Sequence, residues 1–149
     1  MIIEFHKTDE VVKTPVRSNP SDAGLDVFAF LDKDITILPL QSQLIPTGLK
    51  FGIPHGYMLQ VMNRSSVASS LSLIVGAHVI DSGYDGEVFI NIHNVGQTPK
   101  TIINGQKIAQ LVMIPVIPFR VCELKEDSLY NSDITISDRG NGALGSTGS

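Results

Sequence analysis

Residues 79–93 read Val-Ile-Asp-Ser-Gly-Tyr-Asp-Gly-Glu-Val-Phe-Ile-Asn-Ile-His, and this stretch decides the fold class. In its second half, β-branched residues recur at every second position, which is the pattern of a half-buried β-strand. Another apolar run precedes the segment 82–86, whose glycines and aspartate are typical of a turn. The stretch therefore predicts a β-hairpin, with Asp81 at the end of its first arm.

Two interpretations of Asp81 are open at this point. A carboxylate at a strand end beside a tight turn can reach into a cleft and have a functional role there. Asp81 and Asp85 can equally be ordinary turn residues, because aspartate favours turns. The segment by itself does not decide between a functional and a structural role.

The rest of the chain predicts more short strands and almost no helix. Thirteen glycines and eight prolines among 149 residues suit short strands joined by many turns. We expect strands in 2–6, 25–30, 35–38 and 57–62, two short pieces in 43–51, and a strand buried on both faces in 107–117. One short helix is expected in 65–73, capped by Ser65 or Ser66. Together these elements predict an all-β fold, either a barrel or a jelly roll.

The chain is expected to form one domain followed by a tail of different composition. Its length is typical of a single domain, and we assign residues 1–136 to the barrel. Glycine and small polar residues dominate 137–149, so core burial cannot offset the entropy of ordering this segment. It is either a disordered tail or a flexible arm that orders on a phosphate ligand, with charge supplied by Arg139.

Charge and composition exclude several classes of protein. A net charge of −4 with only four arginines argues against direct binding of nucleic acid, which normally needs a basic face. Residues 1–7 carry charges where a signal peptide needs an apolar run, and no apolar stretch approaches the roughly 20 residues of a membrane span. We therefore expect a soluble, cytoplasmic or otherwise intracellular protein. The lone Cys122 is expected in the core or an interface, because an alternating strand would bury it.

Three further segments hold candidate binding residues. Asn-Arg-Ser-Ser-Val-Ala at 63–68 could offer an anion backbone N–H groups, two hydroxyls and the Arg64 guanidinium, although a helix cap plus a surface arginine is the alternative. Gln110 lies among apolar residues, and a partly buried amide needs partners in the core or on a ligand. Asp26, at a turn that enters a strand, could make structural hydrogen bonds or help to place the waters of a metal ion.

Five segments, taken together and in order, resemble the motifs of the homotrimeric dUTPases. They are 23–26 (Ala-Gly-Leu-Asp), 64–68, 80–87, 105–111 and 139–148. They keep the order and spacing of that family and cover nearly the whole chain. The resemblance implies a distorted jelly-roll β-barrel and hydrolysis of dUTP to dUMP and pyrophosphate. Such an activity limits uracil incorporation into DNA and supplies dUMP for thymidylate synthesis.

The resemblance also implies a role for each matching residue. Asp81 matches the general base that activates water against the α-phosphorus, and Tyr84 matches the ring that packs on the deoxyribose and excludes a 2′-hydroxyl. Asp26 matches an acidic group that supports the metal indirectly, through water. The other matches are the catalytic Arg64, Gln110 and Arg139 and the substrate-binding Ser65, Ser66, Val79, Ile80, Phe89, Lys107, Leu144, Gly145, Ser146 and Thr147. Mg²⁺, held mainly by substrate phosphates, and a homotrimer with shared active sites are implied as well.

The chain departs from the family pattern at four positions, and one of them is Ala143, where glycine is usual. Leu144 stands where an aromatic usually stacks on uracil, Lys107 where arginine is common, and His78 where glycine is usual. One alternative is a dCTP deaminase of the same fold, but that family needs a glutamate five residues after the turn glycine, where this chain has Asn91. The other alternative is a catalytically weak dUTPase-like regulatory protein.

Overall fold

The computed structural model of the chain describes residues 2–125 and 129. The chain divides into two units, Met1–Pro118 and Phe119–Ser149, and every helix and strand among the described residues lies in the first unit. The predicted arm 137–149, with Arg139, Leu144, Gly145, Ser146 and Thr147, lies outside the described residues. The predicted boundary at residue 136 therefore stays a prediction.

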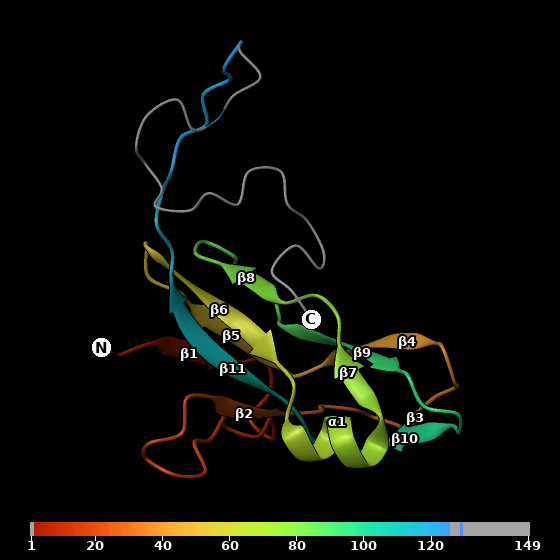
Figure 1. Ribbon diagram of the computed structural model, residues 1–149. Coiled ribbons are helices and arrows are strands. Elements are labelled where there is room, and N and C mark those ends of the chain that lie inside the picture. The colour runs from red at the N-terminus through yellow and green to blue at the C-terminus, as the bar shows by residue number, and fades with distance from the viewer. Residues whose placement is uncertain (1, 126–128, 130–149) are drawn as a thin grey trace. The chain divides into compact units, whose positions relative to one another are not determined.

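Within the described residues, the first unit consists of eleven short strands and one helix (Figure 1). A four-stranded sheet has the order β2 (Leu25–Phe28), β11 (Lys107–Pro115), β6 (Tyr57–Met62) and β8 (Val79–Asp81). A three-stranded sheet has the order β4 (Ser42–Pro46), β9 (Phe89–Asn94) and β7 (Leu73–Val75). Two further pairs are β1 (Glu4–Lys7) with β5 (Leu49–Gly52) and β10 (Lys100–Ile102) with β3 (Ile35–Ile37). All of these pairings are antiparallel, and the fold is the predicted jelly-roll type.

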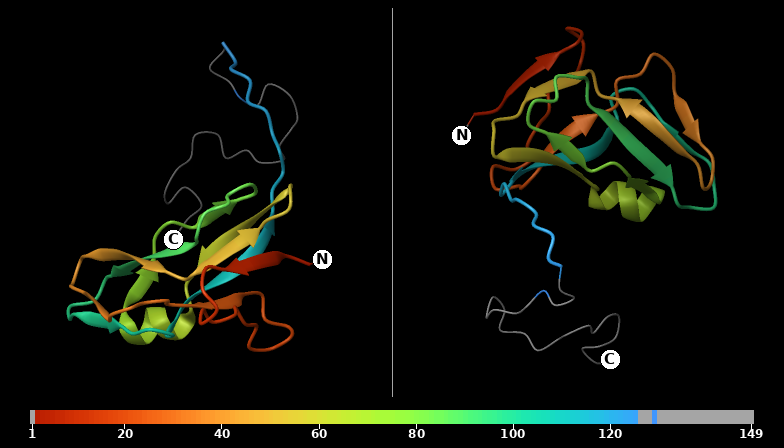
Figure 2. Two further views of the ribbon diagram at one scale, coloured as in Figure 1. Left: turned by 180° about the vertical axis from the view of Figure 1, so that it is seen from behind. Right: turned by 90° about the horizontal axis from the view of Figure 1, so that it is seen from above.

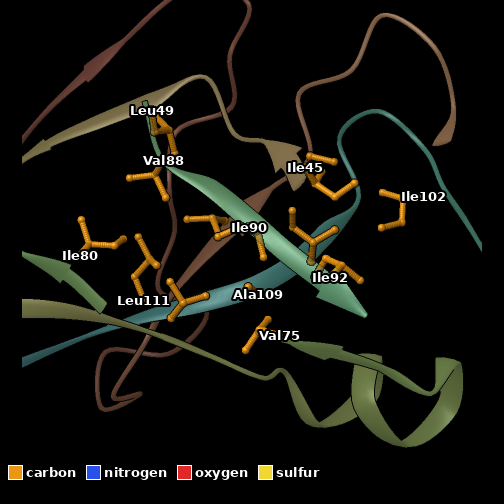
Figure 3. Close-up of a cluster of buried hydrophobic side chains, with 14 of the residues drawn as sticks. Ile45, Leu49, Val75, Ile80, Val88, Ile90, Ile92, Ile102, Ala109 and Leu111 are labelled. Atoms are coloured by element: carbon orange, nitrogen blue, oxygen red, sulfur yellow. The ribbon is translucent and has the colours of Figure 1, made fainter. Parts of the chain in front are cut away.

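The larger two sheets contribute their buried faces to one hydrophobic core (Figure 3). The alternation of β-branched residues in the sequence reflects the burial of one face of β9, because Ile90 and Ile92 are fully buried while Phe89 is exposed. Ala109 and Leu111 of β11 add side chains from the four-stranded sheet. Burial of each large aliphatic side chain stabilises the fold by roughly 1.5–3 kcal/mol. The same burial fixes which side of β9 remains outside.

The hairpin predicted for residues 79–93 is wrong. β8 pairs with β6, so that Asp81 lies opposite Met58, whereas β9 pairs with β4 and β7. Because β9 is flanked on both sides, it has no free edge for β8. Residues 82–88 therefore form a loop that carries the chain from one sheet to the other. This 82–88 loop is longer than the two to five residues, roughly, that usually join paired strands.

The predicted helix exists as α1, Ser65–Leu71, which packs beside β7 (Figures 1 and 2). Neither predicted serine caps it. The N-cap is Arg64, which has extended backbone angles and makes no side-chain cap hydrogen bond, so Ser65 and Ser66 already lie within the helix. Ser72 ends the helix in the left-handed conformation, at φ 54°, and β7 follows directly.

Two other predictions about the C-terminal half need correction. Burial on both faces of β11 holds for Ile108, Ala109 and Leu111, but the later residues of the strand are only half-buried and the strand ends at Pro115. Cys122 is exposed, because the described residues that follow β11 form no strand that could bury it. No helix among the described residues is long and apolar enough to cross a membrane.

Candidate active site

One end of the four-stranded sheet gathers the polar residues that the sequence singled out. Asp26, Gln110 and Met62 are Cα partners across β2, β11 and β6. β6 ends at Met62, so Arg64 lies only two residues beyond this row of Cα partners. A pocket of about 200 Å³ results, here called the polar pocket. It is lined by Ser18, Asp22, Gly24, Asp26, Arg64, Ser65, Ser66 and Gln110.

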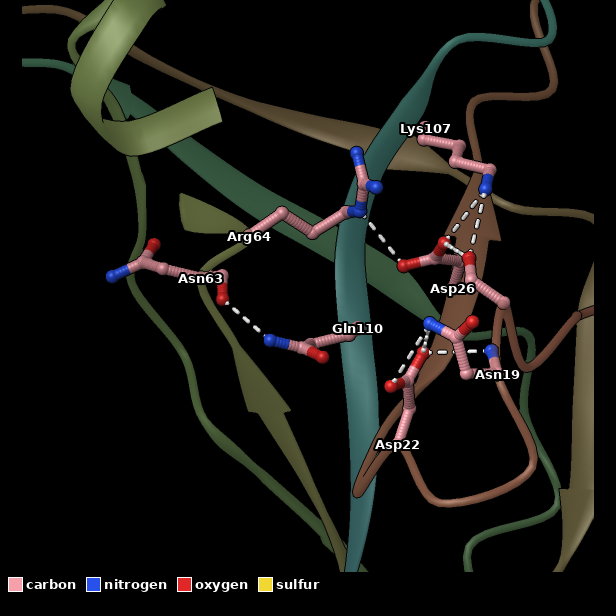
Figure 4. Close-up of polar contacts among 8 residues, drawn as sticks. Asn19, Asp22, Asp26, Asn63, Arg64, Lys107 and Gln110 are labelled. Atoms are coloured by element: carbon pink, nitrogen blue, oxygen red, sulfur yellow. Dashed lines mark hydrogen bonds and ion pairs between the residues drawn. The ribbon is translucent and has the colours of Figure 1, made fainter. Parts of the chain in front are cut away.

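Asp26 fixes the Arg64 side chain at the wall of the polar pocket (Figure 4). The Arg64 Nε donates to Asp26 Oδ1 at 2.7 Å. Among the described residues, no group accepts a hydrogen bond from the two Nη groups of Arg64. Because a guanidinium presents its donors in a rigid fork, these Nη groups suit two oxygens of one phosphate.

The second carboxylate oxygen of Asp26 is also occupied. Oδ2 accepts from Lys107 Nζ at 2.8 Å and from Ser18 Oγ at 3.1 Å. Burial of the Asp26 carboxyl raises its pKa, but hydrogen bonds from Lys107 and Arg64, the charge of Arg64 and the Ser18 hydroxyl outweigh burial and hold the pKa below its ordinary value. Asp26 is therefore a charged, nearly buried anchor for two cations.

Lys107 is placed differently from the other predicted binding residues. Its Nζ lies against Asp26 and within 3.3 Å of Ser18 Oγ, and Lys107 does not line the polar pocket. The side chain also lies over the Phe28 ring, with Nζ 5.9 Å from the ring centroid. Lys107 thus pairs with Asp26, and its contact with substrate stays a prediction.

Gln110 is held in place from two sides. Its Nε2 donates to the Asn63 carbonyl at 2.8 Å, which ties β11 to the turn before α1. Its side chain lies directly against Gly24, where an added Cβ would overlap the amide. Gly24 therefore leaves the space that Gln110 fills. Of the pocket members, Ser18 and Asp22 were given no role from the sequence, and Gly24 was quoted within the first motif without a role.

A second pocket, of about 210 Å³, lies beside the 82–88 loop. It is lined by Val79, Ile80, Asp81, Tyr84, Glu87, Val88 and Phe89. Val79, Tyr84 and Phe89 are exposed at its surface although they are large and apolar. This loop pocket thus joins apolar walls to the carboxylate of Asp81, which is exposed and has no hydrogen-bond donor among the described residues.

The two pockets share no residue and lie apart in the sheet. Asp81 on β8 is opposite Met58, and Gln110 on β11 is opposite Met62. Four residues along β6 and two strand spacings across it separate the two Cα atoms by about 16 Å. One chain therefore does not bring its own Asp81 to its own Gln110 and Arg64.

The carboxylates of the described residues do not form a metal cage. No group of three His, Cys, Asp or Glu side chains that could hold a metal ion exists among them. Both oxygens of Asp26 are engaged, and the Asp22 carboxylate accepts from Asn19. The donor set therefore fits a metal ion that arrives on phosphate oxygens better than one held by the protein alone.

Comparison with families and relatives agrees with the motifs. The family model for dUTPase matches residues 10–148 of the chain. The chain is 38% identical to the deoxyuridine 5'-triphosphate nucleotidohydrolase of Desulfotalea psychrophila, over 93% of this chain and 89% of that protein. It is 36% identical to the enzyme of the same name from Chlamydia trachomatis, over 97% of each.

Solved structures of similar fold come from staphylococcal phages. The dUTPase of Staphylococcus bacteriophage 80alpha, as a mutant with dUpNHpp, aligns with a TM-score of 0.86 and 24% identity over 99% of each chain. The dUTPase from phage phi11 of S. aureus aligns with a TM-score of 0.77 and 25% identity over 85% of this chain and 97% of that one. For a mutant of the phi11 protein, coordination of a structural Mg(II) ion is described.

Proposed function

Because the chain belongs to the dUTPase family, we propose that it is a dUTP diphosphatase, which cleaves dUTP to dUMP and pyrophosphate. The observation that carries the proposal is the family match over 10–148 together with two pockets of complementary chemistry. The polar pocket supplies cationic and neutral donors for phosphates, and the loop pocket supplies apolar walls beside one free carboxylate. The substrate also implies an intracellular location.

The proposed chemistry is attack of water on the α-phosphorus. Asp81 accepts a proton from that water, and the phosphorus–oxygen bond to the β-phosphate breaks, so that pyrophosphate leaves. A positioned general base contributes roughly 10²–10⁴-fold to the rate. Arg64 binds phosphate oxygens through its Nη groups, while Gln110, Ser65 and Ser66 add neutral donors. Fixed donors of this kind stabilise the charge that develops in the transition state.

The loop pocket is proposed to receive the nucleoside. Backbone N–H and C=O groups at Val79, Ile80 and Phe89 would pair with the uracil edge and reject cytosine, because a wrong base leaves buried polar groups unpaired. The Tyr84 ring would pack on the deoxyribose and leave no room for a 2′-hydroxyl. Arg139, Leu144, Gly145, Ser146 and Thr147, from outside the described residues, are proposed to close over the nucleotide.

We propose Mg²⁺ as the cofactor, held mainly by the substrate phosphates. When bound, it neutralises phosphate charge and orients the chain of phosphates. The protein contributes Asp26 indirectly, through water, because both of its carboxylate oxygens already contact cations or a hydroxyl. Asp26 thereby keeps Arg64 and Lys107 in place around the metal-bound triphosphate.

We propose a homotrimer with active sites shared between chains. The separation of about 16 Å between Asp81 and Gln110, worked from strand spacings, supports it, because one α-phosphate cannot contact both residues of one chain. Exposed apolar side chains after β11, among them Ile117 (82% exposed) and Phe119 (84% exposed), also favour burial against other copies. A site made from different copies brings the two pockets together.

The test of the mechanism is Asp81→Asn, with Asp85→Asn as the matched control. Asp85 is an exposed carboxylate of the same loop and pairs with Lys50 instead of facing the loop pocket. We expect Asp81→Asn to abolish pyrophosphate release while dUTP still binds in titration calorimetry. Asp85→Asn should retain turnover. An Asp81→Asn protein that hydrolyses dUTP at the wild-type rate would show that another group is the base.

A further inference from the structure

The ring of Tyr84 rests on its own loop. Its hydroxyl donates to the Glu87 carbonyl at 2.8 Å, and the ring lies over Gly86. The Tyr84 side chain is nevertheless half-exposed, so no covering side chain holds it from the outer side. Two contacts within the loop, one polar and one steric, therefore determine where the ring lies.

Gly86 is required there for space and not for backbone conformation. Its φ is not positive, in contrast to Gly83 of the same loop at φ 90°. A Cβ at Gly86 would overlap the Tyr84 hydroxyl and ring and would lie 2.8 Å from Tyr84 Cε2. An L-residue could thus adopt the backbone of position 86, but the Tyr84 ring would have to move away.

The Glu87 carbonyl, which accepts the hydrogen bond from Tyr84, belongs to a segment of backbone that is held in place. Glu87 Oε1 accepts from the Gly48 N–H at 2.8 Å, which joins the end of the loop to the turn between β4 and β5. The next residue, Val88, donates to the Leu49 carbonyl at 2.8 Å and accepts from the buried Thr47 hydroxyl at 2.7 Å. Because Val88 is itself buried, the Glu87 carbonyl cannot follow a displaced ring.

We propose that Gly86 is a specificity-determining residue: together with the Glu87 carbonyl it positions the Tyr84 ring, and so sets the discrimination between deoxyribose and ribose nucleotides. The inference rests on the proposed function, which puts the sugar against Tyr84. A ring that excludes one hydroxyl must be placed within a fraction of an ångström. Gly86 achieves this without contacting the nucleotide, by leaving the space that the ring occupies.

The test is Gly86→Ala, compared with Gly52→Ala. The Gly86→Ala protein should fold, because the added methyl group meets only the far end of a half-exposed side chain. Gly52 lies in β5 outside both pockets, and a Cβ there would be 3.7 Å from Glu4 Cβ, an ordinary contact. The measurement is the ratio of kcat/KM for dUTP to that for UTP, with circular dichroism as a check on folding.

A pocket that rejects one added hydroxyl discriminates between the two substrates by a factor of roughly 10². We expect Gly86→Ala to lower the ratio of kcat/KM for dUTP to that for UTP by about tenfold. Tyr84→Phe keeps the ring and loses one hydrogen bond, so its ratio should fall only about threefold. Gly52→Ala should keep the wild-type ratio. A folded Gly86→Ala protein with the wild-type ratio would overturn the proposal.

The same comparison is made by binding, with non-hydrolysable imido analogues of dUTP and UTP. Gly86→Ala should narrow the difference between the two affinities by the same factor. A wild-type protein that prefers the deoxy analogue but releases no pyrophosphate from dUTP would refute the proposed hydrolysis alone. Unchanged relative affinities in Gly86→Ala would refute the role of Gly86 alone.

Discussion

Replacing Asp26 with asparagine should destabilise the protein, because a nearly buried carboxylate there joins two cations. The side chain is 10% exposed and contacts Arg64 Nε at 2.7 Å and Lys107 Nζ at 2.8 Å. Asparagine has almost the same shape, but it carries no charge. Its amide can still accept from Arg64, whereas its NH₂ group then faces the Lys107 ammonium, which also only donates.

The expected size of the effect follows from this geometry. Removing one partner of a fully buried ion pair costs about 3–5 kcal/mol. Arg64 and Lys107 keep 25% and 34% of their side-chain surface exposed, so water can partly solvate these two cations after the carboxylate is removed. We therefore expect a loss of about 2–3 kcal/mol in the free energy of unfolding, or about 8 °C in Tm for a domain of this size.

The assay is urea unfolding of both proteins at one protomer concentration, since association couples stability to concentration. Because the folded-state pKa of Asp26 lies below its unfolded value, its contribution is complete above about pH 4 and disappears as the pH falls through the folded-state pKa. The difference between wild type and Asp26→Asn should thus be full at pH 7 and shrink below pH 4. Equal stabilities at pH 7, or a difference independent of pH, would refute the reasoning.

Three further changes test other parts of the structure. Truncation before Arg139 should lower dUTP turnover by about 10²-fold and leave the circular dichroism spectrum unchanged; unaltered turnover would mean that the tail is not an arm. Thr47→Val should cost about 2 kcal/mol in urea unfolding, because the buried hydroxyl donates to the Val88 carbonyl and accepts from the Leu49 N–H. Lys107→Met should raise KM for dUTP roughly tenfold, while Lys107→Arg, which keeps the charge, should stay near wild type. Equal KM values in the two variants would exclude a role for the charge.

Most of the strands, though not β7 and β10, could be predicted from local pattern, and the partners of the strands could not. The alternation through Ile90 and Ile92 identified β9, because one face of that strand is buried. Its pairing with β4 and β7 depends on which edges are free in the whole fold, which no local pattern contains. The predicted hairpin failed for this reason, and β7 itself was missed because Ser72 ends the helix one residue before it.

The sequence identified several residues of the polar pocket, but it did not show how they are arranged in space. Asp26, Arg64 and Gln110 were singled out from separate segments, and the cross-strand row explains why they meet. The orientation of Lys107 toward Asp26 was not predictable, because the hydroxyl and carboxylate that attract it come from distant parts of the chain. Ser18 was missed because it lies in a loop with no recognisable pattern.

The most direct test of the proposed function is a turnover comparison of dUTP, dCTP, dTTP and UTP with Mg²⁺, in which pyrophosphate and ammonia are both measured. We predict rapid pyrophosphate release from dUTP, little from the other three nucleotides, and no ammonia from dCTP. Ammonia release from dCTP would indicate a deaminase on this fold instead. Binding of dUTP without pyrophosphate release would contradict the assignment of an enzyme.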